Sequence, residues 1–225
     1  MRVLCLNCNR ASKRLSDEIR QKNSDIVLLQ EWISHKKDRS GEAQTILDRL
    51  GCVSATRYLV TASNQDHIIL HSSERFLITQ HDDLVVINTY FPAGKTKDRI
   101  EHMKNLSKII QDLETNSMLI AGDFNLAPRL EDGWYGDNHS NFTKKVERIC
   151  FQNLLKDFDL HDIGTEIEWA PTFDRQIKGK SSRFRCDLFL VNSQLKAGSR
   201  LSYDHGFRTQ DGKSDHSALL LELNT

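Results

Sequence analysis

The chain has 225 residues, with 31 basic and 31 acidic side chains, so its formal net charge is zero. This balance excludes a uniformly basic, histone-like coat for nucleic acid, although it is compatible with a local basic rim. Hydrophobic residues make up 38% and charged residues 28%, which is typical of an ordinary globular protein with one large domain.

Targeting and membrane signals are missing from the sequence. No apolar run approaches the ~18 residues that a membrane helix needs. The apolar stretch at residues 3–6 is shorter than the ~7 residues of a signal-peptide core. The five cysteines are odd in number and scattered, unlike the disulfide framework of a secreted protein. We therefore expect a cytoplasmic protein without a membrane partner.

The chain begins with a strand–helix–strand pattern. Residues 3–6 and 26–29 are short apolar runs of the buried-strand kind. Residues 11–22 between them are polar, except that Leu15 and Ile19 lie four positions apart, as on one face of a helix.

The middle of the chain continues with a weak helical pattern at residues 42–50 and then three strands. These strands are predicted at residues 67–71, 76–79 and 84–90. The clearest helix spans residues 98–113, where Asp98 and Glu101 resemble a capping box. Its apolar face is formed by Ile100, Met103, Leu106, Ile109, Ile110 and Leu113.

The last part of the chain adds further elements of both kinds. Strands are predicted at residues 118–121, 186–191 and 218–223, and a helix at residues 143–158. The inner stripe of this helix is predicted to be Val146, Ile149, Leu154 and Leu155. Hairpin-like strands beside a strand–helix–strand unit favour an α/β sandwich with mixed sheets over a purely parallel fold. No linker or repeat divides the chain, so we expect a single domain over residues 1–225.

Polar side chains follow the predicted buried strands, where a rigid strand end can fix a reactive group. Three acids, Glu31, Asp123 and Asp215, would suit a hard divalent cation with its waters. His216 and the strand residue Asp187 would suit an oriented imidazole. Each has an ordinary alternative, such as a turn, a cap or, for Asp187, a salt bridge to a neighbouring arginine. The set as a whole favours a site, which also includes Asn7, Asn9, Tyr90 and Asn125.

Six motifs in order resemble the endonuclease/exonuclease/phosphatase superfamily of Mg²⁺-dependent phosphodiesterases. They are LNCN at 6–9, DIVLLQE at 25–31, INTYFPAG at 87–94, GDFN at 122–125, RCDLFLV at 185–191 and SDH at 214–216. The resemblance spans residues 1–223 and implies a four-layer α/β sandwich with two mixed β-sheets flanked by helices. INTYFPAG is similar to the exonuclease III and abasic-site endonuclease branch, whereas several other branches carry His-Leu there.

The resemblance also implies roles for the polar residues. Glu31, Asp215 and Asn9 would hold Mg²⁺, for which Mn²⁺ could substitute, and the number of ions stays open. Asp123, with Asn125 beside it, would orient or deprotonate the attacking water. The remaining catalytic residues would be His216 held by Asp187, Tyr90 against the phosphate or leaving group, and Asn7 near the metal.

Three departures from the branch leave its substrate open. Ala93 stands where abasic-site enzymes usually carry Asn or Gln. Asp174 follows Phe173 where a second aromatic residue is expected. A pocket for a flipped sugar would thus have to be formed by Phe173 and Phe184, without Trp. The Gly-x-Ala strand common in this branch is replaced by DHIIL at 66–70.

A basic stretch at residues 175–185 holds five cations and no acid, which favours contact with phosphates. Trp134 would stack on a base or, alternatively, pack against its own loop. The residues expected to contact nucleic acid are Arg10, Lys95, Lys178, Lys180, Arg183, Arg185, Phe173, Phe184 and Trp134.

The sequence therefore predicts a metal-dependent hydrolase that cleaves DNA phosphodiester bonds, at abasic sites, at 3′ ends or without such specificity. The first alternative is a phosphodiesterase or phosphatase acting on RNA or a small phosphorylated molecule. The second is a catalytically inactive binding module, which the complete set of acids argues against. One core would use all the apolar helix faces, so we expect a monomer.

Overall fold

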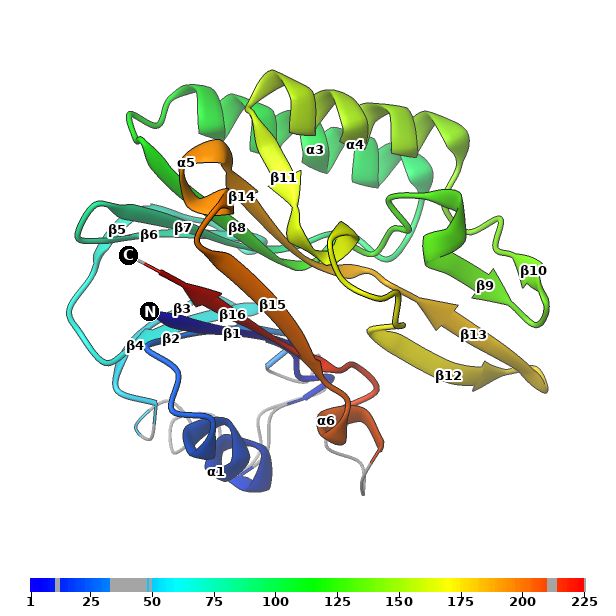
Figure 1. The fold of residues 1–225 in the computed structure, drawn as a ribbon, viewed down its shortest axis with the longest axis horizontal. Helices are drawn as coiled ribbons and strands as arrows, with labels where there is room; N and C mark the ends of the chain where they lie inside the picture. The colour runs from blue at the N-terminus through cyan, green and yellow to red at the C-terminus, as the bar shows by residue number, and fades with distance from the viewer. Residues whose placement is uncertain (11–12, 33–47, 49, 210–213, 225) are drawn as a thin grey trace.

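The computed structural model describes residues 1–10, 13–32, 48, 50–209 and 214–224. Two six-stranded sheets lie face to face, with α3 (Thr96–Gln111) and α4 (Lys145–Asp157) outside one sheet and α1 (Lys13–Gln21) outside the other (Figure 1). This arrangement confirms the predicted α/β sandwich with two mixed sheets flanked by helices. No helix of the described part is long and apolar enough to cross a membrane.

The first sheet contains both chain ends. Its order is β15 (Ser199–Asp204), β16 (Ala218–Leu223), β1 (Arg2–Asn7), β2 (Ile26–Gln30), β4 (Leu59–Ser63) and β3 (Cys52–Ala55). Among the described strands of this sheet, β1 and β2 are the one pair that runs in parallel. The carboxyl ends of these two strands, which carry Asn7 and Gln30, therefore lie side by side.

The second sheet repeats this plan. Its order is β11 (Leu160–Asp162), β14 (Asp187–Asn192), β8 (Ser117–Asp123), β7 (Leu84–Tyr90), β6 (Phe76–His81) and β5 (Ile68–Ser72). Strands β7 and β8 are parallel and end together at Tyr90 and Asp123. Strand β14 runs antiparallel to β8, so its first residue, Asp187, is opposite Asp123.

A smaller sheet of four strands lies beside the two large ones. Its order is β10 (Asn138–His139), β9 (Gly133–Tyr135), β13 (Lys180–Phe184) and β12 (Phe173–Ile177). None of these strands is predicted from the sequence, because they are short and mostly polar. The other described elements are η1 (Leu130–Asp132), η2 (Ile163–Thr165), α5 (Ser193–Lys196) and α6 (Gly206–Thr209).

Apolar clusters fill each interface between layers. Leu28 and Leu221 of the first sheet and Val86 and Phe189 of the second belong to the cluster between the sheets. A second cluster packs α3 and α4 on the second sheet, and a third packs α1 on the first sheet. Burial of these side chains at roughly 25 cal/mol per Å² is the main force that holds the layers together.

Two helix predictions need correction. Helix α3 has Lys95 as its N-cap, without a side-chain hydrogen bond, so Asp98 and Glu101 form no capping box there. On α4, Val146 and Ile149 are 47% and 49% exposed and do not face the core. The buried face is Glu147, Phe151 and Leu154, because Glu147 turns inward to form an ion pair with Arg99. The weak helix predicted at residues 42–50 lies largely outside the described residues.

Arg185 is a structural residue and does not lie on the basic surface predicted from the sequence. Its guanidinium is fully buried and donates two hydrogen bonds of 2.8 and 2.9 Å to each of two carboxylates, Asp132 and Asp162. These acids come from η1 and β11, so the cluster fixes both elements to the start of β14. A guanidinium enclosed in this way cannot contact nucleic acid, and the prediction for Arg185 is wrong.

We expect Arg185→Met to lower the free energy of unfolding by about 3–5 kcal/mol, because it leaves two buried carboxylates without their cation. Chemical denaturation followed by circular dichroism measures this loss. Arg200→Met, a change at an exposed position of β15, is the control and should shift stability by less than ~0.5 kcal/mol. Equal effects of the two changes would contradict the structural role of Arg185.

Candidate active site

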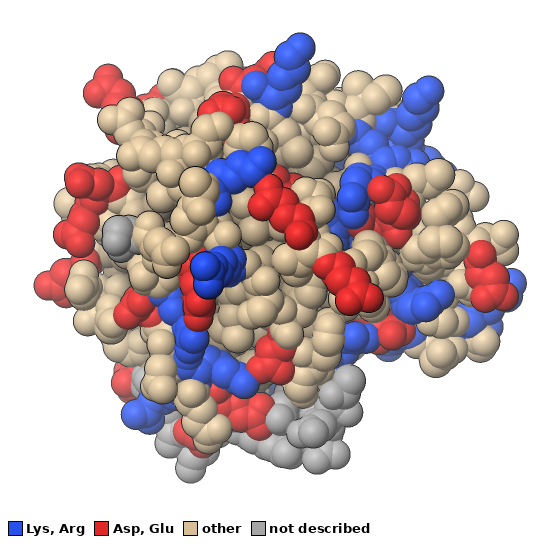
Figure 2. All heavy atoms as spheres, viewed as in Figure 1, with Lys and Arg blue, Asp and Glu red and all other residues tan. Residues whose placement is uncertain are grey.

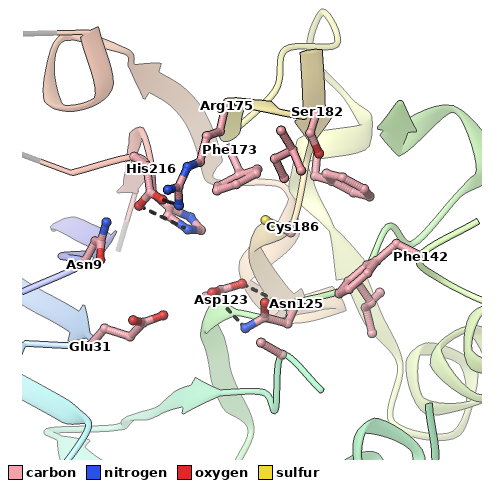
Figure 3. A pocket seen from close by; sticks show the side chains of 15 residues that line it. Asn9, Glu31, Asp123, Asn125, Phe142, Phe173, Arg175, Ser182, Cys186 and His216 are labelled. Atoms are coloured by element: carbon pink, nitrogen blue, oxygen red, sulfur yellow. Dashed lines mark hydrogen bonds and ion pairs between the residues drawn. The ribbon is translucent and has the colours of Figure 1, made fainter. Parts of the chain in front are cut away.

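A pocket of about 380 Å³ opens where the carboxyl ends of the parallel strands of both sheets meet. Figure 3 shows Asn9 and Glu31 on one side of it, Asp123 and Asn125 at its base, and His216 with Phe173 across from them. Residues that are far apart in the sequence therefore converge because the topology brings their strand ends together. The polar part of the lining is Asn9, Glu31, Asp123, Asn125, Arg175, Ser182, Asp215 and His216.

Asn7 connects acids from the two sheets. Its side-chain amide donates to Glu31 Oε1 and to Asp123 Oδ2, both at 2.9 Å. The Asn7 side chain is buried, so these hydrogen bonds are made away from bulk water, where they hold each carboxylate in one position. Asn7 Oδ1 in turn accepts from the backbone N–H of Asn9, which sets the loop after β1.

Glu31 is held from a second direction by Tyr90. The Tyr90 hydroxyl donates to Glu31 Oε1 over 2.6 Å. Burial, together with the charge of Glu31, raises the pKa of Tyr90 well above its ordinary value, so the phenol stays protonated and remains a donor. Glu31 still lines the pocket, and its backbone has a φ of 50° that places the carboxylate at the turn after β2.

Asp123 and Asn125 form a local unit after β8. Asp123 Oδ1 accepts from the Asn125 backbone N–H at 2.8 Å, and Asp123 Oδ2 accepts from the Asn125 side-chain amide at 3.0 Å. Gly122 precedes them with a φ of 151°, and a Cβ there would collide with the carbonyl oxygen of Thr89. The glycine of GDFN is therefore required by the close approach of β7 and β8.

Burial disfavours the charged form of Asp123. Desolvation, with a further contribution from the charge of Asp187 across the strand pair, raises the pKa of Asp123 from 3.8 to about 7. A carboxylate with a pKa near neutrality can both accept and return a proton during hydrolysis. This is the electrostatic property that a residue activating a water needs.

His216 shows the opposite behaviour. Burial opposes its charge, but the carboxylate of Asp187, 2.8 Å from His216 Nδ1, outweighs burial and raises the pKa of His216 to about 10. Ser214 Oγ accepts from the His216 backbone N–H and donates to the carbonyl of Asn7, so the loop before β16 is tied to β1. At neutral pH the imidazole is thus a fixed cation beside the pocket.

Oxygen donors that line the pocket fit a hard divalent cation. Glu31, Asp215 and Asn9 all line the pocket, and carboxylate and amide oxygens are the ligands that Mg²⁺ takes together with waters. Asp215 lies 3.8 Å from the Arg175 guanidinium, a contact that a bound cation would weaken. Of the nine catalytic and metal residues predicted from the sequence, six line the pocket. The other three contact them: Asn7 and Tyr90 donate to Glu31, and Asp187 accepts from His216.

The predicted nucleic-acid residues fall into separate groups. Phe173 and Phe184 line the pocket, as expected for substrate contacts. Lys178 and Lys180 are exposed and Arg183 is partly exposed on the β12–β13 hairpin. Arg10 is exposed just after β1, and Lys95 is exposed at the start of α3.

The contacts of Trp134 favour the alternative that its ring packs against its own loop. Its ring lies 4.1 Å from that of His139, and its indole N–H donates to the carbonyl of Glu131. His139 lies on β10 and Glu131 in η1 just before β9, so Trp134 packs against its own segment of the chain.

Sequence reasoning missed several residues of the pocket. Leu126, Phe142 and Ile177 add an apolar wall next to Phe173 and Phe184. Phe142 lies in a loop without periodicity, so no pattern marks it. Arg75 was also missed: its guanidinium lies 4.8 Å from the Tyr58 ring and 4.7 Å from the Tyr90 ring, and it donates to the Tyr90 carbonyl.

A model of the Endonuclease/Exonuclease/phosphatase family matches residues 3–216, and the chain therefore belongs to this family. The match confirms the predicted family and the predicted class of enzyme, a hydrolytic nuclease or phosphatase. Among curated proteins, no sequence matches this chain significantly.

Solved structures share the fold along the whole chain. An AP endonuclease from Archaeoglobus fulgidus has a TM-score of 0.79 at 19% identity, with 100% of each chain covered. The 3′ phosphatase NExo from Neisseria, bound to a product DNA hairpin, has a TM-score of 0.75 at 21% identity, again with 100% of each chain covered. The AP endonuclease LMAP from Leishmania major has a TM-score of 0.74 at 19% identity, with 100% of this chain and 87% of that chain covered.

The raised pKa of Asp123 makes a prediction for stability without metal. Between pH 4 and pH 7 the unfolded chain has lost the Asp123 proton while the folded chain retains it, so rising pH destabilises the fold. The variant Asp123→Asn lacks this group. As the pH rises from 4 to 7, the free energy of unfolding of Asp123→Asn should therefore increase relative to that of wild type, by on the order of a few kcal/mol. Urea denaturation with EDTA at several pH values measures the difference, and a pH-independent difference would contradict the prediction.

Proposed function

We propose that the protein is a Mg²⁺-dependent phosphodiesterase that hydrolyses DNA in the manner of exonuclease III, at abasic sites or 3′ ends. The observation that carries the proposal is the pairing of two opposite groups around one pocket. Asp123, buried with a pKa near 7, can activate a water, while His216, held as a cation by Asp187, can receive the charge of a phosphate.

Each side chain has a defined task in this reaction. Asp123 orients the attacking water and accepts its proton, and the Asn125 amide keeps the carboxylate in place. The His216 imidazolium contacts a nonbridging phosphate oxygen and stabilises the negative charge that develops there. Tyr90 and Asn7 fix Glu31 by hydrogen bonds so that its position does not change during turnover.

The metal would be held by Glu31, Asp215 and Asn9, whose oxygen donors suit Mg²⁺. When bound, it supplies positive charge that neutralises the phosphate and the leaving oxygen. The protein residues position the ester against this charge and against the water.

DNA is the substrate that the surroundings favour. The Neisseria relative is bound to a DNA hairpin, and two other structural relatives are AP endonucleases. The exposed Lys178 and Lys180 project from the β12–β13 hairpin, whose residues Phe173 and Phe184 line the pocket. Figure 2 shows acidic and basic side chains intermingled over one face of the molecule, so contact with phosphates would depend on local groups such as these rather than on a general field.

A second candidate is a phosphatase or phosphodiesterase that acts on RNA or on a small phosphorylated molecule. Ala93 lines the pocket and is exposed, and its methyl group offers no hydrogen bond to a phosphate. The apolar side chains of Leu126, Phe142 and Ile177 line the same pocket and would accept an apolar part of a substrate that is not DNA. The inactive-module alternative is disfavoured, because all polar groups of the site are present and mutually oriented.

Cleavage of labelled duplexes in Mg²⁺ tests the proposal. One duplex is intact, one carries an abasic-site analogue and one a 3′-phosphate, and a single-stranded RNA completes the set. We expect metal-dependent processing of the abasic or 3′-phosphate duplex. Cleavage of RNA alone would favour the second candidate.

Asp123→Asn serves as the catalytic variant in the same assay. It keeps the shape of the side chain but cannot accept a proton, so the rate should fall by about 10²–10³. A rate close to that of wild type would refute the role of Asp123.

Metal binding can be measured without any substrate. Mg²⁺ at 100 times its Kd should stabilise the fold by about 2.7 kcal/mol, which raises Tm by roughly 5–10 °C for a chain of this size. Glu31→Gln should lose most of this shift. Glu114→Gln, at an exposed position between α3 and β8, is the matched control and should retain it. Loss of the shift in both variants, or in neither, would argue against a site at Glu31.

A further inference from the structure

A second group of potential metal ligands borders the pocket, separate from the residues proposed to bind Mg²⁺. Ligand atoms of Cys186, Asp187 and His216 lie within 4.8 Å of one another, and all three residues are buried. Cys186 lies in the motif RCDLFLV, yet the proposed hydrolysis gives its thiol no task.

The donor set differs in chemistry from that of the proposed Mg²⁺ site. It combines a sulfur, an imidazole nitrogen and a carboxylate oxygen, whereas Glu31, Asp215 and Asn9 offer only oxygen. Thiolate and imidazole ligands select Zn²⁺ and other soft or borderline metals, while Mg²⁺ avoids sulfur. The two sites would therefore separate metals by ligand type.

An unsatisfied atom points independently to a ligand. Asp187 is 1% exposed, and its Oδ2 is the atom that meets His216 Nδ1. Its other oxygen, Oδ1, is buried and has no hydrogen-bond partner among the described residues. A buried carboxylate oxygen without a donor costs free energy that a bound cation would recover.

The thiol is only weakly engaged and can be reached from the pocket. Cys186 Sγ has long contacts of 3.7 Å with Asp187 Oδ2 and 3.8 Å with Thr172 Oγ1. Cys186 lines the pocket, and Figure 3 shows its sulfur between Phe173 and Asp123. An incoming ion would therefore meet the sulfur without passing through the core.

We propose that Cys186, Asp187 and His216 form an inhibitory Zn²⁺ site. Zinc–ligand bonds are about 2.0–2.3 Å long. The three donor atoms, which lie within 4.8 Å of one another, would need to approach each other only slightly to bind one ion. On binding, the Cys186 thiol and the His216 Nδ1–H each lose a proton to solvent, and the hydrogen bond between His216 and Asp187 is replaced by bonds to the metal. A water from the pocket completes the four ligands.

The consequence for activity rests on the proposed function. Zinc at this site removes the imidazolium that would face the phosphate and takes up the carboxylate that orients it. Low concentrations of Zn²⁺ should thus inhibit hydrolysis even when Mg²⁺ is in large excess. The protein would then be active only where free zinc is scarce.

Binding can be tested without reference to catalysis by titration with Co²⁺, a spectroscopic substitute for Zn²⁺, in excess Mg²⁺. Coordination by Cys186 produces a thiolate-to-cobalt charge-transfer band in the near ultraviolet. We expect the band at one equivalent in wild type and in Cys150→Ser, whose thiol is half-buried on α4. We expect none in Cys186→Ser, or in Cys186→Ala if the serine variant does not fold by circular dichroism. No band in wild type, or a band that persists without Cys186, would overturn the proposal.

Inhibition provides the second arm, with the duplex that the enzyme cleaves. Removal of the thiol should raise the Zn²⁺ concentration for half-inhibition by at least about tenfold, because loss of even an outer partner weakens metal sites by 10–100-fold. An unchanged value would place zinc at the proposed Mg²⁺ site and refute the inhibitory site. A cobalt band in a protein that cleaves no substrate would support the metal site and contradict the proposed function. Cleavage without a cobalt band would support the proposed function and contradict the metal site.

Discussion

The site depends on one amide that joins acids from two sheets. Asn7 ends β1 in the first sheet, yet its side chain donates both to Glu31, which follows β2, and to Asp123, which ends β8 in the second sheet. Two carboxylates are thereby held near each other at the edge of the sandwich, at a separation that their charges alone would increase. Tyr90 adds a hydrogen bond from the second sheet to Glu31. The relative placement of the sheets therefore sets the geometry of the chemistry.

The protein contains two buried clusters of charged side chains, one around Arg185 and one around Asp123, with different properties. Around Arg185, four hydrogen bonds pair one cation with Asp132 and Asp162, and the result is a rigid joint. Around Asp123, burial and then the charge of Asp187 raise the pKa of Asp123 to about 7, and the Asp187 carboxylate raises the pKa of His216 to about 10 against the effect of burial. At neutral pH Asp123 is therefore near its titration point and available for proton transfer, while His216 is a cation available for a phosphate.

The same pocket carries an apolar wall and a thiol that hydrolysis itself does not need. Phe142, Phe173 and Phe184 give it shape selectivity, while Ala93 removes a polar contact at its rim. Cys186 places a sulfur atom beside the carboxylate of Asp187 and the imidazole of His216. Under the proposed function, residues around the catalytic groups would set substrate choice and sensitivity to metals, and the same catalytic groups would serve several phosphate esters.

The sequence by itself determined the fold class and predicted the polar residues that the structure gathers around one pocket. Apolar runs mark β1, β2, β7 and β8. The polar residues that follow these strands lie in short contiguous motifs, which can be read directly from the sequence. The single domain and the monomeric state remain predictions. Only the tertiary structure decided that Arg185 is buried while Lys178 and Lys180 are exposed, since a run of cations does not show which side of a strand faces acids from distant elements. It also decided the inward turn of Glu147 on α4, the strands of the small sheet and the convergence of Cys186 with His216. These features depend on partners far along the chain, which local periodicity cannot encode.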